Sequence, residues 1–165
     1  MGLGYPQGMN IKRLGGKIWD ICGSLYRNGV DVTSKLDAMN LQTIREIVDP
    51  GDAGASITDK ALLVVPAGYK FVMVSIDVLS RANPSGVDAT NTSVWLLEVG
   101  TTAKAAKTFN NTVVFPNAGA AVNIPITAGQ SELAAGNVLL LSVTNGATAD
   151  IGESVLEITG YYEKV

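Results

Sequence analysis

Two pairs of carboxylates are the side chains of this sequence that could most readily perform chemistry. Asp49 and Asp52 flank a proline–glycine turn, and Asp150 and Glu153 flank an isoleucine–glycine pair. Glycoside hydrolysis needs only two carboxyl groups, one as an acid and one as a base or nucleophile. Both pairs are predicted in loops where water solvates them, outside any acid-rich, aromatic-lined stretch. We therefore interpret them as turn residues and not as catalytic groups.

The remaining catalytic chemistry is limited by residue types. The chain has no histidine, which is the commonest general base and zinc ligand, so the serine triad and most catalytic zinc sites are excluded. Its single cysteine, Cys22, cannot form an internal disulfide or a thiolate cluster, and we interpret it as a packing residue. Residues 145–153 lack the ligand spacing of a calcium loop. No dinucleotide fingerprint or phosphate-binding loop occurs. The sequence predicts no enzyme, cofactor or metal site, and a module that acts by surface contact.

Composition indicates a folded domain with few surface charges. The 165 residues suffice for one domain and an extension, and 47% hydrophobic with only 16% charged residues disfavours disorder. Residues 1–48 carry six basic and four acidic residues, a net charge of +2, whereas residues 49–165 carry six basic and eleven acidic ones, a net charge of −5. An acidic body disfavours nucleic acid as a partner. Such a weakly charged surface suits a protein packed in an assembly.

The sequence also predicts where the protein is made. No N-terminal run resembles a signal peptide, and no stretch approaches the roughly 18 apolar residues of a membrane helix. We therefore expect synthesis in the cytoplasm of the host, no membrane partner, and an extracellular location only through assembly and release.

Residues 1–48 are predicted to be an N-terminal arm and connecting segment. Met1 to Gly16 holds five glycines and a proline, so it has little reason to fold alone, yet it carries large apolar side chains that suit ordering on a partner. Three basic residues precede the first acidic one, which suits an acidic partner; a solvated terminus is the alternative. The predicted partner-binding residues are Leu3, Tyr5, Met9, Ile11, Lys12, Arg13, Leu14, Lys17 and Trp19.

The connecting segment leaves alternatives open. Lys17 to Cys22 is predicted as a short strand. Thr33 or Ser34 could cap a short helix, with Asp37 at its third position after Ser34, and Leu36, Met39 and Thr43 would then share a face. Residues 41–48 fit a strand equally well.

Residues 49–165 are predicted to be a β-sandwich body. Short runs rich in Val, Ile, Thr and aromatic residues alternate with turn residues, at a spacing of roughly 10–20 residues. In the longest run, the face carrying Val72, Val74, Ile76 and Val78 is the more continuously apolar one, and Trp95 is expected in the core. One helical turn is considered at residues 104–107. The predicted strands cover residues 61–65, 69–80, 93–100, 112–115, 122–126, 138–143 and 154–162.

Regular short strands with turn signals predict an all-β fold, an antiparallel two-sheet sandwich. A jelly roll is the first choice, and an immunoglobulin-like sandwich is the second.

Three segments of the body carry a family resemblance. Val64-Val65-Pro66-Ala67-Gly68-Tyr69 leads into the longest strand, Ala135-Gly136-Asn137 leads into another, and the last strand closes in Tyr161-Tyr162. Over about residues 61–165 the chain resembles the small β-sandwich decoration, or cement, proteins of tailed-bacteriophage virions. The resemblance implies a structural protein on the capsid surface that bridges neighbouring subunits. The implied partners are the major capsid protein of the same virion and copies of the chain itself, as dimers or trimers.

Three other functions remain as alternatives. One is a receptor-binding or fibre module of a virion, which would form trimers and bind sugar. The second is a minor or lattice-building capsid protein, and the third is a sugar-binding module of a larger enzyme. Sugar binding would need exposed aromatic platforms, for which the candidates are Trp95, Phe109, Phe115, Tyr161 and Tyr162.

Overall fold

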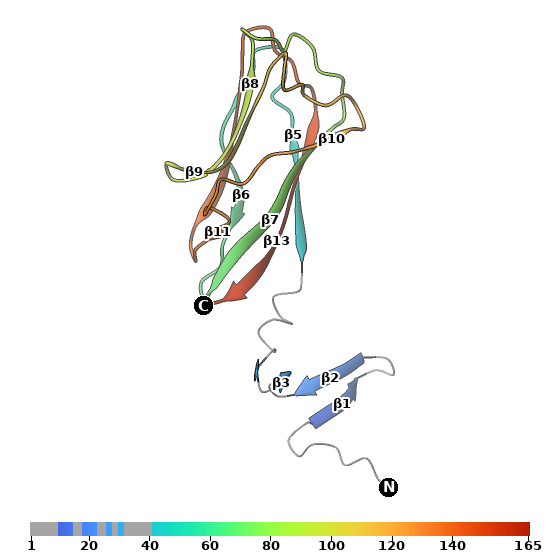
Figure 1. The fold of residues 1–165 in the computed structure, drawn as a ribbon, viewed down its shortest axis with the longest axis vertical. Coiled ribbons are helices and arrows are strands. Elements are labelled where there is room, and N and C mark those ends of the chain that lie inside the picture. The colour runs from blue at the N-terminus through green and yellow to red at the C-terminus, as the bar shows by residue number, and fades with distance from the viewer. Residues whose placement is uncertain (1–9, 15–17, 23–25, 28–29, 32–40) are drawn as a thin grey trace. The chain divides into compact units, whose positions relative to one another are not determined.

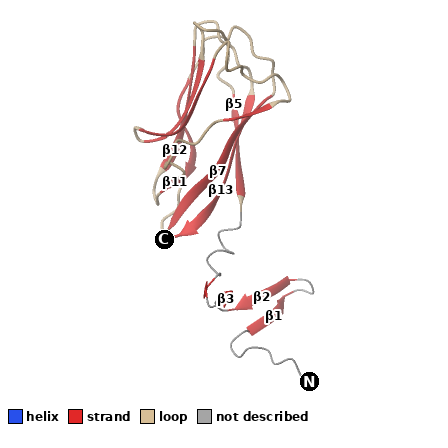
Figure 2. Cartoon of the chain, viewed as in Figure 1, coloured by secondary structure: helices blue, strands red, loops and turns tan. Residues whose placement is uncertain are grey.

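The computed structural model describes residues 10–14, 18–22, 26–27, 30–31 and 41–165. The chain divides into two units, Met1–Met39 and Asn40–Val165, which are taken separately. Figure 2 shows that the described residues form strands and loops without any helix.

The N-terminal unit contains two short antiparallel pairs. Strand β1 (Asn10–Leu14) pairs with β2 (Ile18–Cys22), and β3 (Tyr26–Arg27) pairs with β4 (Val30–Asp31). The strand predicted at residues 17–22 is confirmed from Ile18 onward. Asn10–Leu14, a part of the predicted arm, is a strand whose backbone groups pair with β2. The helix considered from Ser34 lies outside the described residues.

The second unit is built of nine strands separated by turns and loops. Their bounds are β5 (Gln42–Val48), β6 (Ile57–Val64), β7 (Tyr69–Ser80), β8 (Ser93–Val99), β9 (Thr102–Phe109), β10 (Ala121–Asn123), β11 (Glu132–Leu133), β12 (Val138–Asn145) and β13 (Ser154–Lys164). One sheet has the order β10-β7-β13-β5, with β11 also paired to β7, and the other has the order β6-β12-β8-β9. All pairings are antiparallel, so the prediction of an antiparallel two-sheet sandwich is confirmed (Figure 1).

The strand order is that of a jelly roll. Strands pair as in one long folded hairpin: β8 with β9, β7 with β10, β6 with β12, and β5 with β13. The hairpin is then rolled up, which brings β13 beside β7 in one sheet and β12 beside β8 in the other. This is the two-sheet arrangement with Greek-key connections, and the immunoglobulin-like alternative is therefore wrong.

Strand β5 explains where the body begins. The second unit begins at Asn40, whereas the sequence interpretation begins the β-sandwich body at residue 49. The strand alternative for residues 41–48 is the observed one. Gln42–Val48 pairs along its whole length with β13, so it belongs to the sandwich.

The core lies between the sheets, where the central strands β7, β13, β12 and β8 bury alternate side chains. Trp95, on β8, is fully buried as expected. Its ring stacks on Phe115 at a centroid distance of 5.9 Å, and Phe115 meets Phe109 edge to face at 4.8 Å. Aromatic pairs of this geometry contribute about 0.5–1.5 kcal/mol beyond the area they bury. The three rings therefore anchor the loop after β9 to the core.

Phe115 lies in a loop and not in the strand predicted at residues 112–115. The Asn110 Oδ1 atom accepts hydrogen bonds from the backbone N–H groups of Thr112 and Val113, both at 2.8 Å. Asparagine forms such local turns readily, because its side chain replaces a backbone partner. The apolar residues 112–115 resemble a strand in sequence, but Phe115 packs inward from a loop.

The prediction of one helical turn at residues 104–107 is also wrong, because this segment belongs to β9. Alanine and lysine favour a helix only as a weak prior, and tertiary packing overrides it. Here β9 pairs with β8 from Ser93↔Phe109 to Val99↔Thr102, and Ala105 is fully buried.

A β-bulge corrects the predicted apolar face of β7. Ser75 pairs with Thr159 and Met73 with Gly160, so Val74 is the extra residue and is 54% exposed. A bulge shifts the alternation by one residue. The core face is consequently Phe71 and Met73 before the bulge, and Ile76, Val78 and Ser80 after it.

The other predicted strands agree with the structure, with shifted ends. Strand β7 has the predicted bounds. The strands predicted from residues 61, 93, 138 and 154 correspond to β6, β8, β12 and β13. The strand predicted at residues 122–126 overlaps the shorter β10.

Gly160 is required where β13 crosses the bulge, which yields a stability prediction. A Cβ atom at this position would overlap the carbonyl oxygen of Val72 and the ring of Phe71. We expect Gly160→Ala to lower the free energy of unfolding by about 1–3 kcal/mol, because backbone and ring must shift. Urea unfolding followed by circular dichroism measures the change. Thr159→Ala, on the adjacent outward position, should cost no more than about 0.5 kcal/mol. Equal losses for both variants would contradict the overlap.

Candidate functional site

The two carboxylate pairs, Asp49–Asp52 and Asp150–Glu153, lie in loops outside the named strands. Asp49 Oδ1 accepts a hydrogen bond from the Gly51 N–H at 3.0 Å, and Asp150 Oδ1 accepts one from the Gly152 N–H at 2.9 Å. Both carboxylates therefore shape the backbone two residues further on, as aspartate commonly does in turns. The second carboxylate of each pair does not share this turn-forming role. Asp52 is exposed, and Glu153 forms an ion pair with Arg81.

The predicted partner-binding residues lie in the N-terminal unit, where side chains are not described. Leu3, Tyr5, Met9 and Lys17 lie outside the described residues altogether. The other five are placed only by backbone register: Ile11, Lys12, Arg13 and Leu14 in β1, and Trp19 in β2 opposite Arg13.

Within the body, the outer face of β12, β8 and β9 is a candidate interaction surface. Three cross-strand rows build it, and each row runs over β12, β8 and β9 in turn. We call this surface the aliphatic face; its rows are Leu140↔Glu98↔Ala103, Ser142↔Leu96↔Ala106 and Thr144↔Val94↔Thr108.

The aliphatic face is held rigidly, and two carboxylates lie on it or beside it: Glu98 in an end row, and Asp59 of β6, whose Oδ1 atom lies 3.4 Å from Ser142 Oγ. Successive residues of a strand point to opposite faces, and here the alternate positions, such as Trp95, Leu97 and Leu141, are fully buried in the core. Among the nine residues in its three rows, Glu98 is the single ionisable one. Val94, Leu96 and Leu140 are half-buried by their neighbours, which leaves a flat surface of methyl groups and hydroxyls.

The outer face of the other sheet has a different character. Its central row is Arg45↔Glu157↔Asp77↔Asn123, and the Arg45 Nε atom lies 2.8 Å from Glu157 Oε1. Water solvates such charges well, so covering this row would cost desolvation energy. Of the two outer faces, the aliphatic face has fewer ionisable side chains in its rows, so a partner that covers it would pay less desolvation energy.

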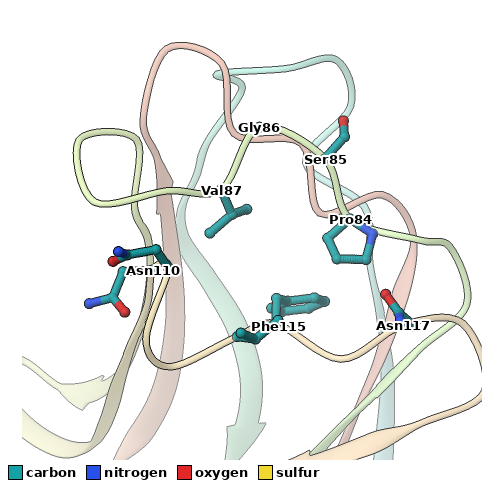
Figure 3. Close-up of a pocket in the computed structure, with 9 residues that line it drawn as sticks. Pro84, Ser85, Gly86, Val87, Asn110, Phe115 and Asn117 are labelled. Carbon is teal, nitrogen blue, oxygen red and sulfur yellow. The ribbon is translucent and has the colours of Figure 1, made fainter.

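A cavity lies at the end of the sandwich where the β7–β8 and β9–β10 loops meet. It has a volume of about 320 Å³. Figure 3 shows Val87, Pro84 and Phe115 around its apolar centre, with Asn110 and Asn117 at opposite sides. Phe115 is only 1% exposed, so it closes the cavity floor and offers no platform for a ring. Of the aromatic candidates for sugar binding, Trp95 and Phe109 are fully buried as well.

Charged side chains gather near the opposite end of the sandwich, beside a second cavity of about 540 Å³. Lys70 Nζ lies 3.1 Å from Glu132 Oε1 and 3.2 Å from Glu163 Oε2. These two carboxylates, Glu132 first, raise the pKa of Lys70 above its usual value of 10.5. Lys104 Nζ donates to Gln130 Oε1 at 2.8 Å and to the carbonyl of Glu132. The cluster neutralises itself and ties β7, β11 and β13 together.

In the part of the chain that the structure describes, no three histidine, cysteine or acidic residues gather in a way that could hold a metal ion. Nor does that part contain a helix of the length and hydropathy needed to cross a membrane.

Comparisons with known proteins add little to this picture. No protein-family model and no curated protein sequence matches the chain. Among solved structures, it is similar to a cyclase from Fischerella sp. TAU in complex with 4-(1H-indol-3-yl)butan-2-one, with 16% identity and a TM-score of 0.33, over 70% of this chain and 61% of that one. It is also similar to the Stig cyclase Fisc from Fischerella sp. TAU, with 17% identity and a TM-score of 0.33, over 69% and 61% of the two chains. The chain thus spans less than two thirds of these cyclases.

The lysine cluster predicts how stability depends on pH. Because the folded state raises the pKa of Lys70, the contribution of this lysine to stability is complete below pH 10.5 and is lost as the pH rises further. Burial raises the pKa of Tyr162, which acts in the same direction above 10.0. We expect the melting temperature to fall across this range. Lys70→Met lacks the ion pairs at every pH, so the difference between its melting temperature and that of the wild type should shrink across this range. Lys70→Arg stays charged, so its melting temperature should fall only at higher pH. Parallel curves for all three proteins would contradict the ion-pair account.

Proposed function

We propose that this protein is a capsid decoration protein of a bacteriophage, which binds the outside of the head and bridges neighbouring major capsid subunits. The observation that carries the proposal is the aliphatic face, a preformed surface on a jelly-roll body whose three rows hold one ionisable side chain, Glu98. The resemblance of residues 61–165 to phage decoration proteins supports the same function. Contact and not turnover is the proposed mode of action, since Asp49 and Asp150 are occupied in shaping turns.

The aliphatic face supports docking on a complementary apolar patch of a capsid subunit. Covering apolar surface contributes about 25 cal/mol for each Å² removed from water. Leu96 lies in the middle row between Ser142 and Ala106, so a partner that covers it also covers both neighbouring strands. Glu98, in an end row, is the one group of these rows that would need a hydrogen-bonding partner or access to water.

Rigidity and copy number strengthen such a contact. Backbone pairing fixes β12, β8 and β9 side by side, so little conformational entropy is lost when the face binds. A molecule that touches two capsid subunits converts its second contact into an intramolecular one with a high effective concentration. Internal pressure in the head would then have to break several interfaces together. The basic residues Lys12, Arg13 and Lys17 are proposed to add a second contact, to an acidic region of the capsid.

A receptor-binding or sugar-binding virion module is the second candidate function. The cavity at the loop end favours it, because the side chains of Ser85 and Asn117 line that cavity and make no hydrogen bond within the described body. Amide and hydroxyl groups can serve sugar hydroxyls as both donors and acceptors. A glycan array separates the two candidates: a decoration protein gives no glycan signal.

A charge placed on the aliphatic face tests the proposed function. Leu96→Lys should weaken binding to heads that lack the protein by at least about tenfold, because an ammonium group would be buried without a partner. Sedimentation of purified heads with added protein measures the binding, and the melting temperature of the heads measures reinforcement.

Val155→Lys is the matched control. Val155 occupies a half-buried outward position on the other sheet, between Ile47 and Leu79. Its binding should stay within about twofold of the wild type, well under 1.4 kcal/mol. Failure of the unaltered protein to bind or stabilise heads would refute the decoration function. Equal binding by Leu96→Lys would show that another surface makes the contact.

A further inference from the structure

The jelly roll leaves four sheet edges, and three of them are unsuited to adding another strand. Strand β6 has two register shifts against β12, and Asp59, within the second shift, has a φ of 52°. Strand β9 is partly covered by the following chain, since the Thr127 N–H donates to the Lys104 carbonyl and Ala105 bridges to Ile126. Strand β10 is three residues long, and the Asn123 carbonyl accepts from Lys107. Bulges, coverage and short length are the usual protections of sheet edges.

The fourth edge, β5, is regular and is largely uncovered by the rest of the described body. It pairs with β13 from Val48↔Ser154 to Gln42↔Gly160 without a register shift. The Ile47 carbonyl accepts a hydrogen bond from Lys60 Nζ at 2.8 Å, so this carbonyl points away from β13. In an antiparallel pair, every second residue turns both its N–H and its C=O toward the same side. The backbone groups of Thr43 and Arg45 therefore point outward too.

The close side chains on the β13 side agree with this assignment. Outward-pointing residues form the narrow, non-hydrogen-bonded pairs of an antiparallel ladder. Thr43 Oγ1 lies 3.4 Å from Thr159 Oγ1, and Arg45 forms its ion pair with Glu157 directly opposite. Lys60 hydrogen-bonds only the Ile47 carbonyl, near one end of β5. The backbone groups of Leu41, Thr43 and Arg45 that point away from β13 have no pairing partner among the described strands.

We propose that β5 pairs antiparallel with β5 of a second copy of this chain, about a two-fold axis at Thr43. The pairing places Thr43 opposite its own symmetry mate and Leu41 opposite Arg45 of the second copy. All three residues turn their backbone groups outward, so the register yields about six hydrogen bonds across the axis. It also avoids the Ile47 carbonyl that Lys60 occupies. The two β10-β7-β13-β5 sheets then form one continuous sheet.

The side chains of β5 suit a copy of themselves. Leu41 is 60% exposed and Ile47 is 53% exposed, and the two-fold axis brings Leu41 of each copy diagonal to Ile47 of the other. Diagonal neighbours on a sheet lie within reach of long side chains. Threonine meets threonine at the centre, which is a favourable cross-strand pair, and no like charges face each other in the pairs from Leu41 to Arg45. A self-complementary surface of this kind is what a two-fold interface requires.

Hydrogen exchange of the full chain tests the proposal directly. In the dimer, the amide N–H groups of Thr43 and Arg45 should exchange at least tenfold more slowly at high protein concentration than after dilution. Ile44 and Glu46, whose amides face β13, should be protected at both concentrations. Light scattering on the same samples should show the mass shift from monomer to dimer.

A proline variant isolates the backbone hydrogen bond. Thr43→Pro removes an N–H that points away from β13, and edge strands accept proline at such positions. It should leave the melting temperature of dilute protein close to that of Thr43→Val, the matched control, and abolish the dimer. Thr43→Val keeps the N–H and should still dimerise.

Three results would overturn the proposal. They are a monomer at all concentrations, protection of Thr43 that does not change on dilution, and a dimer that survives Thr43→Pro. The exchange measurement on the wild type decides the matter even if the proline variant fails to fold. The proposal is independent of the decoration function, because the aliphatic face belongs to the other sheet and head binding is measured separately.

Discussion

Burial of one face of each central strand, β7 and β13 in one sheet and β8 and β12 in the other, is the constraint on which the whole body depends. Phe71 and Leu156 from one sheet and Trp95 and Leu141 from the other are fully covered, and no single hairpin could cover them. Rolling the nested pairs into two sheets satisfies this demand, because it also brings β13 beside β7 and β12 beside β8. Whatever the outward positions carry is then free for contact with partners. The surfaces of the two sheets are thus made by the strand positions that alternate with the buried ones.

The fold could be predicted from the sequence to a large extent. Tyr69–Ser80 and Ser93–Val99 alternate strongly between turn residues, and periodicity alone locates them. The failures have physical causes. Residues 104–107 favour a helix locally but are held in β9 by pairing with β8. Residues 112–115 look like a strand, yet Asn110 caps them in a turn. The bulge at Val74 reverses the faces of half a strand, and no local pattern signals it.

The candidate surfaces could not be predicted from the sequence in the same way. Val94, Leu96 and Leu140 are unremarkable as single apolar residues, and they become one surface only because the roll places β12 beside β8. The open edge of β5 likewise depends on knowing which strands are covered. From the sequence, the partner-binding residues are expected in the glycine-rich N-terminal arm, and this stays a prediction. The outward residues of the body give no such signal, because they have the same types as its core.

The two proposed contacts use different parts of the body and are compatible with each other. Pairing through β5 extends one sheet sideways, while the aliphatic face of the other sheet stays available for a capsid subunit. A dimer would present two aliphatic faces and so could bridge two subunits. Electron cryomicroscopy of heads carrying the bound protein tests this account most directly. The account predicts density in which β8 and β12 lie against the capsid and the outer face of β13 is solvated. A bound molecule with its aliphatic face turned to solvent would contradict it.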